Sequence, residues 1–99
     1  MKKVTINGAE YKLAYNLRSL FVYEEMTGHP YRAEKTIDSY MLIFAMLQAN
    51  NEGFDMTVDA FIDACDEDFG IFQAFSEVME AYANRMSAFV ESKKKAVTQ

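Results

Sequence analysis

Tyr40-Met-Leu-Ile-Phe-Ala-Met-Leu47 is the stretch that decides the fold, because eight consecutive apolar residues leave no side of a helix free for water. Thr36-Ile-Asp-Ser39 precedes it and Gln48-Ala-Asn-Asn51 follows it, and both segments are typical of helix ends. Ala, Met and Leu favour a helix, so the pattern predicts one at about residues 37–49. The run is far shorter than the ~20 apolar residues of a membrane span. We therefore expect a core helix that the other elements cover.

The residues before this helix predict a β-hairpin at residues 2–15 and then a helix at about 17–27. Val4 and Ile6 alternate with polar residues, and Asn7-Gly8 supplies the two positive-φ positions of a type I′ turn. Asn16 is a typical helix N-cap, and Gly28 is a typical left-handed residue after a helix end. Two strands alone are marginally stable, so one face of the hairpin must lie on helices. Its free edge is one place where a partner strand could add.

The C-terminal half predicts a short helix at about 58–65, capped by Thr57, and a long one at about 69–92 that Asp66-Glu-Asp68 opens. Apolar residues recur along the long helix at intervals of three and four: Phe72, Phe75, Met79, Tyr82, Met86 and Phe89. Such a helix is ~35 Å long, about the diameter of the whole domain. Either this seam packs on the central helix, or its far end docks on a second chain. The fold class is thus α+β, mainly α, in a single domain spanning residues 1–99.

Charge is distributed unevenly along the chain, whose net charge is −5. Between Thr36 and Asn84 there are ten carboxylates and no Lys or Arg. Nucleic-acid binding needs a cationic face, so direct DNA or RNA binding is not expected. The single Cys65 cannot form an internal disulfide, which fits a reducing compartment. The N-terminus runs straight into the strand pattern, so no signal peptide is expected.

Candidate chemistry is sparse. Asp66, Asp68, Gly70 and Glu77 match four positions of an EF-hand loop, but Ile71 stands where that loop needs glycine. His29 and Cys65 are the only residues of their types, which argues against a zinc cluster or a Cys-His nucleophile. The sequence predicts no catalytic residues, no cofactor and no metal site, and therefore a protein that is not an enzyme.

The order of elements resembles the small tail assembly chaperones of long-tailed bacteriophages and prophages. Three stretches carry the resemblance: the hairpin from Val4 to Leu13, the helix Leu17-Arg-Ser-Leu-Phe-Val-Tyr-Glu-Glu-Met-Thr-Gly28 with its Glu-Glu-x-Thr-Gly ending, and Met56-Thr-Val-Asp-Ala-Phe-Ile-Asp-Ala-Cys-Asp66. The resemblance implies a non-enzymatic protein that keeps the tape-measure protein soluble and helps to recruit tail-tube subunits. It also implies a place in the host bacterial cytoplasm and absence from the mature virion.

An adaptable apolar surface would suit a long helical client, because Met-rich surfaces repack around different apolar anchors. The predicted partner-binding residues are Val22, Met26, Met86, Phe89 and Val90. Two other hypotheses stay open at this point. One is an acidic decoy that mimics nucleic acid and occupies a basic cleft, and the other is a homo-oligomeric scaffold joined through the last helix.

Overall fold

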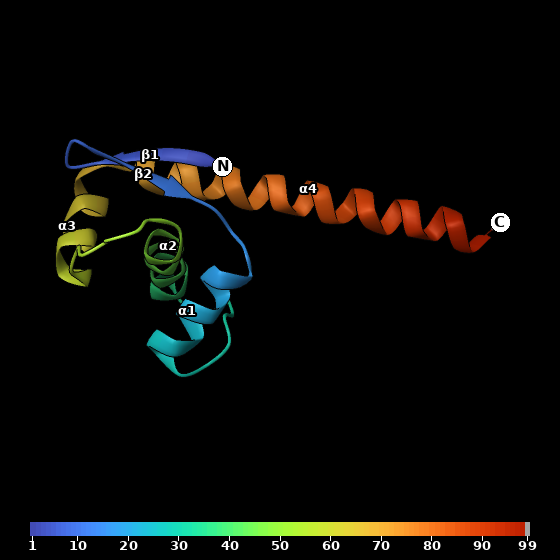
Figure 1. The fold of residues 1–99 in the computed structure, drawn as a ribbon, viewed down its shortest axis with the longest axis horizontal. Helices are drawn as coiled ribbons and strands as arrows, with labels where there is room; N and C mark the ends of the chain where they lie inside the picture. The colour runs from blue at the N-terminus through green and yellow to red at the C-terminus, as the bar shows by residue number, and fades with distance from the viewer. Residues whose placement is uncertain (99) are drawn as a thin grey trace.

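The computed structural model describes the backbone of residues 1–98 and the side chains of residues 1–93. A two-stranded antiparallel sheet is followed by four helices, and the last helix projects from the body (Figure 1). The elements are β1 (Lys2–Ile6), β2 (Ala9–Leu13), α1 (Leu17–Thr27), α2 (Thr36–Asn50), α3 (Val58–Glu67) and α4 (Gly70–Thr98). The predicted α+β, mainly α class is confirmed.

The hairpin has the predicted turn at Asn7 and Gly8. Asn7 and Gly8 have φ values of 51° and 82°, and Ile6 pairs with Ala9 on either side of them. Val4, Ile6 and Leu13 are buried on the face that lies against the helices. The opposite face carries the exposed ion pair between Lys3 and Glu10. One apolar and one polar face explain the alternation in the sequence.

Helix α2 is the centre of the core. Its six consecutive residues 42–47 are all buried, and only Phe44, at 7%, keeps any measurable exposure. Helix α1 packs along α2, β2 crosses it, and α3 contacts its side. Phe61 of α3 meets Phe44 at 5.6 Å between ring centroids. Burying aliphatic and aromatic side chains on every side of one helix is the main source of stability here.

The two short helices begin as the sequence predicts. The Asn16 side chain accepts a hydrogen bond from the Ser19 amide at 2.9 Å, and the Thr57 hydroxyl accepts one from the Ala60 amide at 3.1 Å. Gly28 ends α1 with φ of 80°, and its amide donates to the Glu24 carbonyl. The Glu-Glu-x-Thr-Gly ending is therefore a helix C-terminus closed by a left-handed glycine.

The acidic run after α3 is placed differently from the prediction. Asp66 and Glu67 are the last residues of α3 and do not open α4. Asp68 lies between the two helices, where its carboxylate accepts a hydrogen bond from the Gly70 amide at 2.8 Å. Helix α3 continues for two residues past Cys65, so the chain turns later than the acids suggested.

Helix α4 is longer than predicted and gives the molecule its shape. Its 29 residues correspond to about 44 Å of helix, and the molecule measures 53 × 28 × 26 Å. The radius of gyration is 15.3 Å, whereas a compact domain of this length has about 13 Å. The excess arises because the C-terminal half of α4 has no other part of the chain beside it (Figure 1).

Candidate protein-binding surface

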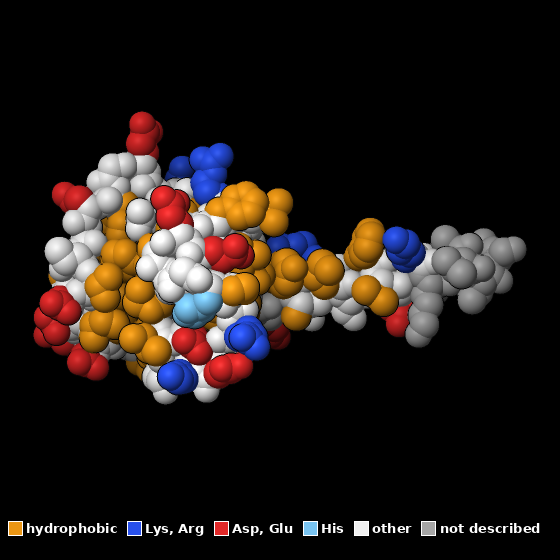
Figure 2. Space-filling view, turned by 90° about the horizontal axis from the view of Figure 1, so that it is seen from below, with side chains coloured by type: hydrophobic (Ala, Val, Ile, Leu, Met, Phe, Trp, Pro, Cys, Tyr) orange, Lys and Arg blue, Asp and Glu red, His pale blue; other side chains and the backbone are white. Residues whose placement is uncertain are grey.

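The projecting part of α4 presents apolar side chains to solvent. We call residues 83–93 the overhang, because every side chain in this range is exposed. Met86, Phe89 and Val90 are 45%, 60% and 54% exposed. Figure 2 shows apolar side chains continuing from the body on to this part of the helix. An exposed apolar cluster of this kind is typical of a surface that binds another protein.

The overhang continues the same face of α4 that forms the core. Ile71 and Phe75 are buried, and Tyr82 is the last residue of the face to contact the body, with its ring 4.7 Å from that of Tyr15. At ~3.6 residues per turn, Phe89 lies directly above Ile71. Met86 falls beside Phe89 on this face. The apolar seam therefore runs on after the body that covers it has ended.

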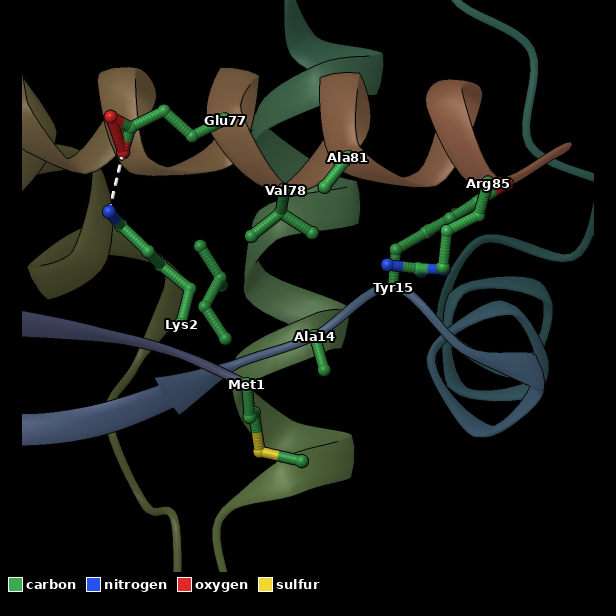
Figure 3. Close-up of a pocket in the computed structure, with 9 residues that line it drawn as sticks. Met1, Lys2, Ala14, Tyr15, Glu77, Val78, Ala81 and Arg85 are labelled. Carbon is green, nitrogen blue, oxygen red and sulfur yellow. Dashed lines mark ion pairs between the residues drawn. The ribbon is translucent and has the colours of Figure 1, made fainter. Parts of the chain in front are cut away.

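The first half of the seam packs mainly against β1. The sequence did not predict this contact between α4 and β1, which is made in addition to the predicted contact with the central helix. Contact with α2 is made by Phe72, whose ring lies 5.4 Å from that of Tyr40. The hairpin lies beside α4 (Figure 3), and its apolar face needs helices on it because two strands do not form a core alone.

The two predicted site residues on α1 lie apart from those on α4. Val22 and Met26 are half-buried and pack against the core, next to the buried Tyr23. Met86, Phe89 and Val90 lie on the overhang, the part of α4 that projects away from the body (Figure 1). The structure thus brings together the three α4 residues and does not bring Val22 and Met26 to them.

The exposed side of α1 is opposite to the side that carries Val22 and Met26. Leu17 and Phe21, one helical turn apart, are both largely exposed. The periodicity of α1 showed two apolar sides and gave no sign of which would be covered. That choice is made by Ser19, which is completely buried where its hydroxyl donates to the Ala14 carbonyl.

A cleft of about 460 Å³ lies where α4 leaves the body (Figure 3). Its walls are the start of the hairpin, the segment after β2 and the outer turns of α4. At one side Lys2 and Glu77 form an ion pair of 2.6 Å, and Arg85 lies at the other. Val78 and Ala81 provide apolar surface between them. This cleft extends the apolar face of the overhang back towards the core.

A second concave site lies at the other end of the molecule, between the start of α2 and α3. We call it the acidic groove; it is lined by Thr36, Ile37, Tyr40, Ile62, Cys65 and Asp66. Ile37 is 58% exposed, although it is in the first turn of the core helix. Burial raises the pKa of the Cys65 thiol to about 11, with Asp66 and Asp68 adding to the shift. The thiol is therefore protonated near neutral pH.

The EF-hand positions do not form a loop. Helix α4 begins at Gly70, so most of the positions that would wrap around a cation are helical. Glu77 pairs with Lys2, and the carboxylate of Asp68 is bonded to a backbone amide. Among the side chains of residues 1–93, no three His, Cys, Asp or Glu lie close enough to hold a metal ion. In the same range, no helix has both the length and the apolarity needed to cross a bilayer.

Comparison of the chain with protein-family models, curated proteins and solved structures finds no match.

Proposed function

We propose that this chain is a non-enzymatic tail assembly chaperone of the bacteriophage type, which binds the tape-measure protein in the host cytoplasm and helps to recruit tail-tube subunits. The observation that carries the proposal is the uncovered apolar face of the overhang. A tape-measure protein is long and helical, and an amphipathic helix can lay its apolar face along Met86, Phe89 and Val90.

Three features support a helical client on this surface. The overhang is a straight helix, so its exposed face is a narrow apolar strip suited to pairing with another helix. Met86 and Phe89 offer a soft, polarizable contact that adapts to different anchors. The cleft beside Val78 and Ala81 gives the client a place to insert one larger side chain.

Co-purification tests the proposal directly. The chain is co-expressed with a bacteriophage tape-measure protein, and the triple variant Met86→Ala, Phe89→Ala, Val90→Ala is compared with the wild type. We expect the triple variant to fold and to lose the client. The matched control changes three exposed residues on the opposite side of the overhang, as Asn84→Ala, Ser87→Ala and Glu91→Ala, and should keep it. Equal recovery by both variants would refute the site.

Salt dependence separates this function from the acidic decoy. A hydrophobic contact changes little between low and high ionic strength, whereas a nucleic-acid mimic loses affinity steeply as its charges are screened. Retained client binding at high salt supports the chaperone. Loss of binding to a basic protein at high salt, with the triple variant still binding, would support the decoy.

A further inference from the structure

We propose that the overhang of one molecule docks in the acidic groove of a second copy, so that the free protein associates head to tail. This inference goes beyond the proposed function and does not depend on it. Both surfaces belong to the described part of the chain, both are apolar at the centre, and their flanking charges are opposite.

The overhang supplies an apolar centre with cations beside it. Phe89 is the most exposed of its apolar residues, and the Lys93 ammonium lies 5.8 Å from the centre of the Phe89 ring. Arg85 flanks the same face one turn earlier, where it lies 6.0 Å from the ring of Tyr82. Glu91 projects from the opposite side of the helix, since it lies two residues from Phe89. The docking face of the overhang therefore carries positive charge only.

The acidic groove supplies an apolar floor with carboxylates beside it. Ile37 and Ile62 line it from α2 and α3, and Val58 extends the apolar strip along α3. Asp59, Asp63 and Asp66 follow one edge of this strip at intervals of four and three residues, so they form a row on one side of α3. All three are exposed. A helix that brings apolar side chains and cations together matches this arrangement.

The overhang cannot reach the acidic groove of the same molecule. Asp66 lies just before α4, and Phe89 is separated from the start of α4 by about 28 Å of continuous helix. Figure 1 shows α3 at one end of the long axis and the C-terminal end of α4 at the other. The contact is therefore between copies, and because the two surfaces differ, it is heterologous and can repeat into chains. Association between copies should therefore depend on concentration.

The test uses one variant on each surface and then mixes them. Phe89→Asp removes the apolar anchor of the overhang and places a carboxylate against the acidic row, while the groove stays intact. Ile37→Asp damages the groove, while the overhang stays intact. Both positions are exposed, so both variants should fold, which circular dichroism checks. Ser87→Asp, on the opposite side of the overhang, and Gln48→Asp, on an exposed position of α2, are the matched controls.

Sedimentation velocity over a concentration series gives the readout. We expect the wild type and both controls to associate, and each single variant to be weaker by about tenfold or more in dissociation constant. A mixture of Phe89→Asp and Ile37→Asp should form one-to-one dimers and nothing larger, since only one intact pair of surfaces remains. A wild type that stays monomeric throughout, variants that associate like the wild type, or a mixture that shows no dimer would each overturn the proposal. Failure here leaves client capture by the overhang untouched, because no client is present.

Discussion

The side chain of Asn51 takes the place of a third strand beside Lys12. Its amide oxygen accepts a hydrogen bond from the Lys12 amide at 2.8 Å, and its amide nitrogen donates to the Lys12 carbonyl at 2.9 Å. The outer edge of β2 is thereby closed at this residue by the end of α2. An edge strand with free backbone groups invites pairing with other chains, so this contact protects the hairpin as well as fixing it on the core helix.

Removing this contact should destabilise the fold measurably. Asn51→Ala leaves both backbone groups of Lys12 without their partner, and we expect a loss of about 1–3 kcal/mol in the free energy of unfolding. Urea denaturation followed by circular dichroism measures it. Gln48→Ala, at an exposed position of the same helix, is the control and should change stability by less than about 0.5 kcal/mol. Equal stability of the two variants would show that water replaces Asn51 without cost.

Truncations on α1 should lower the free energy of unfolding more than truncations on the overhang of α4. Val22→Ala and Met26→Ala remove half-buried side chains that pack on the core, so each should cost about 1–2 kcal/mol. Phe89→Ala and Val90→Ala remove exposed side chains and should cost less than about 0.5 kcal/mol in dilute protein. Thermal unfolding of the four variants makes the comparison. A large loss from Phe89→Ala would mean that the overhang is covered within one molecule.

The Cys65 thiol should react slowly with alkylating reagents at neutral pH. Its pKa of about 11 leaves only a small fraction as the reactive thiolate, and below that pKa the fraction rises about tenfold for each unit by which the pH is raised. Iodoacetamide labelling between pH 7 and pH 9, followed by mass spectrometry, measures this slope. The unfolded protein in urea is the reference and should react faster at every pH, because the thiol is then exposed. Similar rates for the folded and unfolded protein would contradict the burial of Cys65.

Asp38 should make the fold sensitive to acid. Its carboxylate accepts hydrogen bonds from the backbone amides of Lys35 and Glu34, chiefly Lys35, and these lower its pKa below the ordinary value of 3.8. A lowered folded-state pKa contributes stability that is present above pH 3.8 and is lost as the pH falls through the folded value. Asp38→Asn should therefore lower stability at pH 7 and narrow its difference from the wild type in acid. A constant difference from pH 7 to pH 3 would rule out this linkage.

Local signals in the sequence predict the elements well. The bounds of α1 agree with those expected from Asn16 and Gly28, since both ends have residues that favour a particular backbone geometry. The buried run in α2 and the Asn7-Gly8 turn are equally local. The end of α3 was missed by two residues because acids suit the start of the next helix as well as a solvated end.

The surfaces were harder to predict because they depend on which elements meet. Helical periodicity shows that α1 has two apolar sides. Which side is buried, that of Leu17 or that of Val22, depends on how the end of β2 positions α1 against α2. Asn50 and Asn51 looked like a helix stop, whereas Asn50 also donates to the Ala14 carbonyl and Asn51 to Lys12. These contacts join residues far apart in sequence, so no local pattern reports them. The sequence allowed Met86, Phe89 and Val90 to be exposed, because the predicted helix was about as long as the whole domain, but it did not decide the matter.

Residues 83–93 form an uncovered apolar face, and we propose that a protein partner covers it. Amide hydrogen exchange measured by mass spectrometry tests it most directly, first on dilute free protein and then with the co-purified client. We predict faster exchange in residues 83–93 than in residues 71–79 of the free protein, and slower exchange in 83–93 when the client is bound. Equal protection of the two segments in the dilute protein, or a client that leaves the exchange of residues 83–93 unchanged, would contradict the account.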